Sequence, residues 1–349
     1  MLESIAQKGN TRQRTRALRT LSISNSIVTA RVGFDETNRP ERQAARSQRL
    51  LGLGSVVKEV VGGTPLRTIM TADHTQRPTG PVLRAEGDPA TGDLAVDEAY
   101  DYMGATYDFY WDIFNRDSIN DAGMPLNGTV HYGVDYDNAF WDGQRMIYGD
   151  GDHEQFLRFT KAVDVIGHEL THGVTQNEAG LIYWGQTGAL NESVSDVFGS
   201  LVRQYYYNQT ASTADWLIGH GLFTPSVQGV AIRSLAAPGT AYDDPVLGKD
   251  PQPAHMKDYQ HTVQDNGGVH INSGIPNHAF YLAATKMGGN SWEAAGLIWY
   301  QTLLRPALTK VANFQAFARL TVSTAQVLFP FGSQADAVTE AWSEVGVDV

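Results

Sequence analysis

The chain has 349 residues, a mass of 38.2 kDa, a formal net charge of −12 at pH 7 and no cysteine. Without cysteine, disulfide bonds, iron–sulfur clusters, thiolate zinc sites and a cysteine nucleophile are excluded, so any metal site must be built from His, Asp and Glu. No apolar stretch reaches the roughly 18 residues that a membrane helix needs, and the first twenty residues lack the apolar core of a secretory signal.

Charge is distributed unevenly along the chain. Residues 1–63, called the head below, have a net charge of +6, and residues 64–349, called the body, have −18. Four basic residues lie close together near the start: Arg12, Arg14, Arg16 and Arg19. This patch could bind nucleic acid, or the head could dock on the acidic body. We favour docking and expect no nucleic-acid partner, because the head also has apolar residues that a solvated tail does not need: Leu2, Ile5, Leu18, Leu21, Ile23 and Ile27.

The head is expected to be partly helical. The pattern predicts an amphipathic helix over residues 1–21, an extended segment over 24–33 and, after a break at 38–40, a second helix over 41–51. Residues 51–63 are apolar and rich in glycine. That composition predicts a flexible junction that an endoprotease could cut.

The body changes in character near residue 156. Strands and turns are predicted over residues 66–148, including strands at 130–136 and 145–148, with one helix at about 96–115. Helical patterns follow at 159–177, 189–207, 271–287, 291–304, 313–328 and 332–345. A β-rich half followed by an α-rich half predicts an α+β fold, with the boundary inside or just after the helix that ends near residue 177.

The main chemical motif is H-E-x-x-H at residues 168–172. His168 and His172 are four residues apart, so a helix places both imidazoles on one face, where they can reach one metal ion. Glu169 lies beside the first of them and can act on a metal-bound water. The alternative is a helix with two incidental histidines, and the residues that follow in the chain argue against it.

A second helical pattern supplies carboxylates for the same ion. Glu192 can complete a site of two histidines and one carboxylate, which leaves a fourth position for water. Asp196, one turn later, can accept the free ring N–H of a ligand histidine and so fix its orientation. The residues around Glu192 are apolar and almost uncharged, so we expect this carboxylate to be buried and to require a cation.

The sequence resembles the thermolysin family of zinc endopeptidases. The resemblance lies in residues 137–141, 148–152, 165–175, 180–183, 188–196, 265–274 and 341–346, and it covers about residues 64–349. The short basic head and residues 243–255 resemble the protealysin subgroup, which has a compact propeptide. The resemblance implies a thermolysin-like fold with the zinc site in a cleft between two halves. The implied division is a propeptide at 1–63, a β-rich peptidase domain at 64–176 and an α-helical domain at 177–349.

The resemblance also assigns catalytic roles. Three residues would bind one catalytic zinc ion: His168, His172 and Glu192. Glu169 would be the general base, and Tyr183 and His270 would donate hydrogen bonds to the oxyanion, while Asp265 keeps His270 oriented and cationic. The seven histidines outside these motifs are interpreted as ordinary residues.

The same resemblance implies how a peptide is bound. Asn138 and Ala139 match edge-strand positions that hold an extended peptide, and Arg233 matches a residue that braces the carbonyl after the cut bond. Three apolar residues would line a pocket for a large hydrophobic side chain such as Leu or Phe after the cut: Phe156, Val165 and Ile232. The alternative for these three is ordinary core packing.

Calcium binding is where the sequence departs from the family. Asp164 and Asp215 match acidic positions of the family's double calcium site, but Arg203, Leu217 and His220 stand at other positions of that site. A positive Arg203 would repel a divalent ion. We therefore expect the double site to be absent, with room for one looser calcium ion near Asp164.

We interpret the chain as a zinc-dependent neutral endopeptidase made as an autoprocessed zymogen. The alternative is a metal-bound but catalytically silent interaction protein, and the presence of both Glu169 and His270 favours the enzyme. We expect a monomer without a membrane anchor, whose partners are protein and peptide substrates and its own inhibitory head. Secretion by a route other than a standard signal peptide is expected, with a cytoplasmic location as the alternative.

Overall fold

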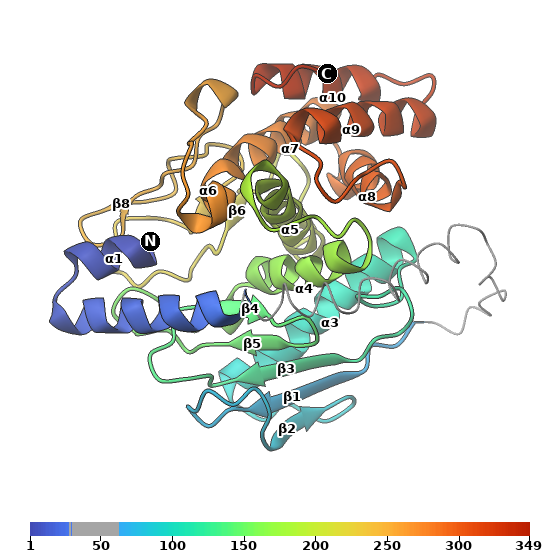
Figure 1. Ribbon diagram of the computed structural model, residues 1–349. Coiled ribbons are helices and arrows are strands. Elements are labelled where there is room, and N and C mark those ends of the chain that lie inside the picture. The colour runs from blue at the N-terminus through green and yellow to red at the C-terminus, as the bar shows by residue number, and fades with distance from the viewer. Residues whose placement is uncertain (28, 30–62) are drawn as a thin grey trace.

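The computed structural model describes residues 1–27, 29 and 63–349 (Figure 1). The β-rich half contains β1 (Arg67–Thr71), β2 (Val82–Ala85), α3 (Leu94–Phe114), β3 (Leu126–Val130), β4 (Ala139–Trp141) and β5 (Met146–Tyr148). The helical half contains α4 (Val163–Asn177), α5 (Gly185–Tyr206), α6 (Asp265–Asn272), α7 (Gly274–Met287), α8 (Leu297–Leu304), α9 (Phe314–Leu328) and α10 (Gln334–Glu344). Two small two-stranded sheets lie between α5 and α6 in the chain: β6 (Leu217–Ile218) with β7 (Arg233–Ser234), and β8 (Asp243–Asp244) with β9 (Gly248–Lys249). The predicted α+β architecture is confirmed.

The β-rich half is built on one five-stranded sheet, in the order β2-β1-β3-β5-β4. Strands β1, β3 and β5 are parallel, whereas β2 and β4 pair antiparallel at the two edges. Helix α3 packs on β1 and β3, and α4 packs on β4. Because β4 is an edge strand, its outer side is available for pairing with a further strand.

The strand predicted at 130–136 is wrong, because β3 already ends at Val130. His131 and Asp135 adopt left-handed conformations, with φ angles of 55° and 51°, which turn the chain away from the sheet. The strand predicted at 145–148 is confirmed as β5.

Helices α4 and α5 cross closely in the centre of the molecule. A Cβ atom on Gly199 of α5 would lie 2.4 Å from the backbone oxygen of Asp164 in α4, and one on Gly167 would lie 3.2 Å from Cα of Gly199. Glycine at these positions therefore lets the two backbones approach. The close crossing brings the H-E-x-x-H turn of α4 beside the segment of α5 that carries Glu192.

The remaining helices of the C-terminal part pack together, and α7 and α9 contact α5. Helix α10 packs on α7 and α9, and α8 packs on α9. The rings of Trp299 and Trp342 stack in this layer, with centroids 6.2 Å apart, and both side chains are fully buried. The helices predicted from residue 159 onward are confirmed, with short 3₁₀ turns at 159–161 and 256–258 and one π-helical turn at 292–296.

The described start of the head forms two helices rather than the single helix predicted over residues 1–21. Helix α1 (Leu2–Lys8) ends at Gly9, whose ψ of 165° is extended, and a second helix covers residues 11–27. The side chain of Asn10 accepts a hydrogen bond from the N–H of Gln13 (3.0 Å), which caps the second helix. The prediction of an extended segment is wrong for residues 24–27, which are helical. Residue 28 and residues 30–62 lie outside the described residues. These include most of the rest of that segment, the predicted helix at 41–51 and residues 51–62 of the junction.

The described part of the head docks on the body, as its charge and apolar residues predicted. Ser4 Oγ donates to the backbone oxygen of Val246 (3.0 Å), and the side chains of Ile5 and Ala17 are buried. Further along, the second helix runs toward β4 (Figure 1), where Ser24 Oγ lies 3.2 Å from the hydroxyl of Tyr136. The head therefore spans both halves of the body.

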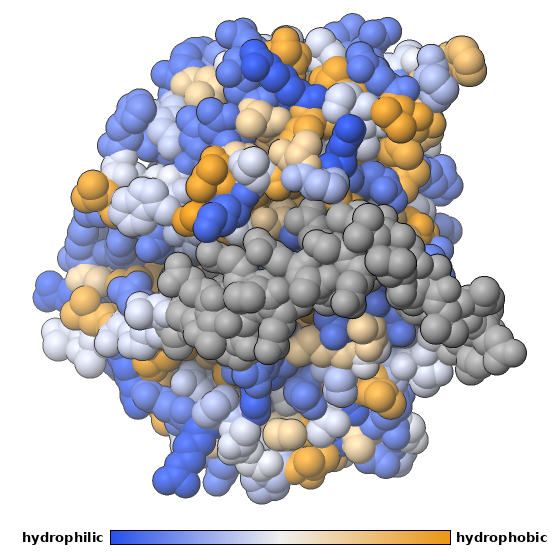
Figure 2. Space-filling view, turned by 45° about the vertical axis from the view of Figure 1, so that its right-hand side comes forward, coloured by the Kyte–Doolittle hydropathy of each residue, from blue (hydrophilic) through white to orange (hydrophobic). Residues whose placement is uncertain are grey.

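The coloured surface in Figure 2 shows hydrophobic side chains scattered among hydrophilic ones. Within residues 1–27 and 63–349, no helix combines the length and the apolar character that a membrane span requires.

The turn after β3 contains a histidine that should stabilise the fold only at low and neutral pH. His131 Nδ1 lies 3.0 Å from both carboxylate oxygens of Asp150, and its Nε2 lies 3.0 Å from Asp93, the N-cap of α3. The hydrogen bond with Asp150 is the main cause that raises the pKa of His131 to about 9. A group whose pKa is raised on folding stabilises the folded state below its unfolded pKa of about 6.5 and loses that contribution as pH rises through about 9.

We expect His131→Gln to lower the free energy of unfolding by about 1–2 kcal/mol at pH 6 and by much less at pH 9.5. Urea unfolding at both pH values, in an inactive background to prevent self-digestion, measures this difference. The exposed His261 provides the matched control, since His261→Gln should change little at either pH. An equal loss at both pH values for His131→Gln would contradict the assignment.

Candidate active site

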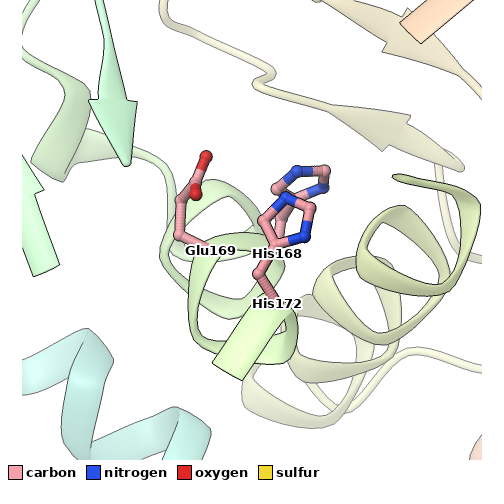
Figure 3. Close-up of side chains that lie close together, drawn as sticks. All are labelled: His168, Glu169 and His172. Carbon is pink, nitrogen blue, oxygen red and sulfur yellow. The ribbon is translucent and has the colours of Figure 1, made fainter. Parts of the chain in front are cut away.

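The two histidines of the motif converge on one point, as the helical spacing requires. His168 and His172 project from successive turns of α4, with ring centroids 4.7 Å apart and ring planes at 90° (Figure 3). Both side chains are buried. Among the described residues, His168, Glu169 and His172 form the one group of three metal-binding side chains whose ligand atoms all lie within 4.8 Å of one another.

Glu192 of α5 faces both histidines. Its carboxylate oxygens lie 3.4 Å from His168 Nε2 and 3.5 Å from His172 Nε2. The side chain is 1% exposed, and Oε2 has no hydrogen-bond partner. Burial opposes ionisation, but the charges of His270 and His172 hold the pKa of Glu192 well below its usual value. A buried anionic oxygen without a hydrogen-bond partner between two imidazole nitrogens fits a zinc ion.

The opposite ring nitrogens are held by other side chains. His168 Nδ1 lies 2.8 Å from Asp196, and His172 Nδ1 lies 2.8 Å from Asn191 Oδ1 and 3.1 Å from Ser195 Oγ. These acceptors hold a proton on Nδ1, so the Nε2 atoms, which face Glu192, are the ones that would bind a metal ion. Asn191 and Ser195 were not among the predicted site residues, although both lie within one turn of Glu192.

Asp196 is the centre of a buried polar network. Besides His168, it accepts hydrogen bonds from Arg233 Nε and Nη2 (2.7 and 2.6 Å) and from Asn277 Nδ2 (2.8 Å). Burial would raise the pKa of Asp196, but the positive charges of Arg233 and His168 lower it to about 2. The carboxylate is therefore anionic at neutral pH. Asn277 lies on α7, and no sequence motif signalled its role.

Glu169 lies between the histidines and the edge strand. Its Oε2 accepts a hydrogen bond from the backbone N–H of Trp141 in β4 (3.1 Å), which fixes the carboxylate on the side of the site that faces the sheet. The side chain is only partly buried, unlike those of the two histidines. A carboxylate in this position can exchange protons with a water molecule beside the two imidazoles.

Tyr183 and His270 stand on the other side of Glu192. The hydroxyl of Tyr183 donates to Glu192 Oε1 and lies 3.2 Å from His270 Nε2. Asp265 accepts from His270 Nδ1 (2.5 Å) and from the backbone N–H of His270 (2.8 Å). Burial would lower the pKa of His270, but the charges of Asp265 and Glu192 raise it to about 9. The pair therefore offers two hydrogen-bond donors beside the metal position.

A left-handed turn makes the position of His270 attainable. Residues 265–268 all have positive φ, including Gly267 (82°) and Gly268 (80°). A Cβ on Gly267 would lie 3.0 Å from the backbone nitrogen of Gly185 at the start of α5. Only glycine permits both this conformation and this close approach at low cost. The turn lets Asp265 cap the helix that carries His270.

The predicted substrate-binding residues lie beside Asp196, in the main core and at the start of β4. Arg233 donates to Asp196, which in turn contacts His168. Phe156 and Val165 are buried in the main core, and Ile232 packs against that core. Asn138 and Ala139 lie at the start of β4, where the side-chain amide of Asn138 donates to Ser24 Oγ of the head (3.2 Å). The head thus contacts a residue predicted to hold the substrate.

The positions that match the family's double calcium site are bridged by an arginine. Arg203 lies 3.5 Å from Asp164 and 2.9 Å from Asp215, and its Nη2 also lies 3.2 Å from His220 Nδ1. Burial raises the pKa of Asp164 to about 6. A guanidinium group therefore neutralises the two aspartates that the sequence retains.

The chain is similar to known proteins over most of its length. A family model described as "Thermolysin metallopeptidase, catalytic domain" matches residues 74–176, and one described as "Thermolysin metallopeptidase, alpha-helical domain" matches residues 179–347. An extracellular metalloprotease from Pectobacterium carotovorum subsp. carotovorum is 56% identical over 292 residues, which cover 84% of each chain. Thermolysin from Alicyclobacillus acidocaldarius subsp. acidocaldarius is 40% identical over 291 residues, which cover 80% of this chain and 51% of that protein. A solved structure, the precursor of protealysin from Serratia proteamaculans, is similar over 99% of this chain and 97% of its own, with a TM-score of 0.86 and 52% identity.

Proposed function

The chain belongs to the thermolysin family of metalloendopeptidases, and we propose that it is a zinc-dependent neutral endopeptidase that is made as a self-processing zymogen. The observation that carries the proposal is the arrangement of His168, His172 and Glu192, in which both Nε2 atoms face a buried carboxylate while both Nδ1 atoms are held by acceptors. We assign residues 1–63 to the inhibitory head, 64–176 to the β-rich peptidase domain and 177–349 to the α-helical domain.

The proposed reaction is hydrolysis of a peptide bond by water. His168, His172 and Glu192 would hold one zinc ion, which would lower the pKa of a bound water and polarise the substrate carbonyl. Glu169 takes a proton from the attacking water and then donates it to the amine of the leaving peptide. The backbone N–H of Trp141 holds the carboxylate in place.

Charge that develops on the carbonyl oxygen is stabilised from the opposite side. Tyr183 and protonated His270 donate hydrogen bonds to the oxyanion, and Asp265 keeps His270 oriented and charged. Asp265 already holds His270 in place, so this donor requires little reorganisation, whereas the Tyr183 hydroxyl, which donates to Glu192 here, would turn toward the oxyanion. The substrate itself is held in an extended conformation along β4 by Asn138 and Ala139.

We assign the substrate preference to the apolar pocket. Phe156, Val165 and Ile232 would receive a large hydrophobic side chain on the C-terminal side of the cut, and Arg233 would brace the carbonyl that follows. The geometry around Arg203 supports the absence of a double calcium site, since the guanidinium occupies the space between Asp164 and Asp215. The names of the relatives, which include extracellular proteases, support secretion.

The inhibitory role of the head rests on its contact with the cleft. Ser24 takes the hydrogen bond that the side chain of Asn138 would offer to a substrate. With no cysteine in the chain, inhibition must be steric rather than through a thiolate on the metal. The structural similarity to a protealysin precursor extends over 99% of this chain and so includes the head.

Self-processing is tested by following the mass of the purified full-length chain over time, together with casein hydrolysis, with and without a chelator. We expect the wild-type chain to be cut between residues 51 and 66, before a Val or Leu, and activity to rise as the head is lost. The chelator should prevent both changes. The Glu169→Gln chain should stay at full length until active protease is added, and it should then be cut in the same window.

Two results would contradict the zymogen proposal. One is spontaneous trimming of pure Glu169→Gln protein, which would show that another protease makes the cut. The other is an uncut full-length chain that is as active as the trimmed one. A chain that begins at Thr64 tests inhibition separately, because its activity does not depend on the cut.

A further inference from the structure

The head places one arginine in an acidic pocket of the body. Arg16 is 8% exposed, and its guanidinium lies 2.7 Å from Asp135, 2.9 Å from Glu154 and 3.9 Å from Asp152. We call the body residues Asp135, Asp137, Asp152 and Glu154 the arginine pocket. Arg12, which is mostly exposed, approaches Glu154 less closely, at 3.5 Å.

Contacts within the body orient part of the pocket. Asp152 Oδ1 accepts the backbone N–H groups of Glu154, Gln155 and Phe156 (2.9, 2.8 and 3.0 Å), which leaves its Oδ2 directed at Arg16. Asp137, beside Asp152, is 5% exposed, and its Oδ1 has no hydrogen-bond partner. Burial and the charge of Asp152 raise the pKa of Asp137 to about 8, while Arg16 lowers it. Asp137 is therefore mostly protonated at neutral pH, and loss of the head would leave the carboxylates of Asp135, Asp152 and Glu154 without the charge of Arg16.

The pocket adjoins the part of the cleft that we assign to the C-terminal side of the cut. Asp152 hydrogen-bonds the N–H of Phe156, which we place in the apolar pocket for the residue after the cut. Asp137 directly precedes Asn138, which we assign to the substrate backbone. An acidic residue of the pocket therefore lies close in the chain to each of the two binding elements, immediately before Asn138 and four residues before Phe156.

The helix of the head gives the approximate distance between the arginine pocket and Asn138, because Arg16 lies in the pocket and Ser24 contacts Asn138. Arg16 and Ser24 lie eight residues apart on one helix, which corresponds to about 12 Å. An extended peptide covers the same distance in about three to four residues. A substrate that contacts Asn138 can therefore bring a side chain to the arginine pocket within a few residues of the cut.

We propose that, after the head is removed, the arginine pocket binds an arginine side chain of the substrate that lies two to four residues on the C-terminal side of the cut bond. The inference rests on the proposed endopeptidase function and adds a second element of specificity to it. Arginine is favoured because its planar fork can reach Asp135 and Glu154 at once, as Arg16 does, whereas lysine presents a single ammonium group.

The test uses the trimmed enzyme and internally quenched peptides with the same Leu after the cut. Arginine is placed in turn at the second, third and fourth positions after the cut, and each peptide is compared with one that carries neutral citrulline there. We expect kcat/KM to be about tenfold higher for arginine at one of these positions, and the advantage to shrink as salt is raised. Arginine placed before the cut should give no advantage.

Variants of the pocket decide whether these residues cause the preference. The arginine-to-citrulline ratio should fall to about one in Asp135→Asn/Glu154→Gln, and it should persist in Asp348→Asn, an exposed carboxylate near the C-terminus. If the double variant does not fold, Glu154→Gln alone should reduce the ratio, since this residue is partly exposed. Equal cleavage of both peptides at all positions, or a ratio unchanged in the variants, would overturn the inference. Failure to cut any peptide would instead contradict the proposed endopeptidase function.

Discussion

Replacing Glu169 by Gln is expected to reduce peptide hydrolysis by about 10³–10⁴-fold while one zinc ion remains bound. The amide keeps the size of the carboxylate and can still accept the hydrogen bond from Trp141, so the local structure should persist. It cannot take a proton from water at neutral pH, and proton transfer is the role that we assign to this side chain. Metal content measured on the same protein sample as kcat/KM separates the two effects.

The shortened variant Glu169→Asp is the informative control for this prediction. The aspartate side chain would keep a carboxylate base, but it is one methylene group shorter and places the base farther from the two histidines. The activity of Glu169→Asp should therefore lie between those of the wild type and Glu169→Gln. Near wild-type hydrolysis by Glu169→Gln would show that the general base is another residue. Loss of zinc from Glu169→Gln would instead show that the side chain supports the metal site.

A second large effect should separate metal binding from turnover. His270→Ala is expected to lower kcat/KM by about 10²–10³-fold without changing zinc affinity, because its contact forms with the oxyanion. Asp196→Asn is expected to weaken zinc binding by about 10–100-fold, because Asp196 orients His168. Competition titrations with a coloured chelator give the affinity, and kinetics at saturating zinc give the turnover.

Asp196 also contacts Arg233 and Asn277, so its replacement could disturb the fold. Asn191→Ala provides a second route to the same question, since it removes an acceptor from His172 Nδ1 and leaves Ser195 in place. It should weaken zinc binding in the same direction as Asp196→Asn. Equal loss of zinc affinity in Asp196→Asn and His270→Ala would refute the division of roles.

Local sequence patterns predicted most of the helices and the pair of histidines, His168 and His172, in the candidate metal site. The i, i+4 spacing of His168 and His172 requires only one helical turn, and α4 provides it. Apolar periodicity likewise predicted the helices from residue 159 onward, because each signal is contained within the element that it describes. The strand predicted at 130–136 was wrong because His131 and Asp135 adopt left-handed conformations after β3. The alternation of apolar and polar residues does not reveal the sign of the backbone angle φ.

The charge pattern and apolar residues of the head correctly predicted that it docks, but not where. The head has a net charge of +6 and the body −18, so the two attract each other, but net charges do not specify which surface of the body the head contacts. The capped break at Gly9–Asn10, which the apolar pattern did not predict, divides the described start of the head into two helices. The position of Arg16 between Asp135 and Glu154 follows from the packing of the second helix on the body.

The sequence by itself determined the chemistry of this protein, namely which residues can bind a metal, carry a proton and form helices, because those properties depend on residue type and near-neighbour spacing. The tertiary structure alone decided which distant groups meet. It placed Asn277 and Arg233 on Asp196 and Trp141 on Glu169, and it placed an arginine of the head among three carboxylates of the body. Contacts between residues tens to hundreds of positions apart depend on how helices and sheet pack, such as the glycine crossing of α4 and α5, and no local periodicity contains that information.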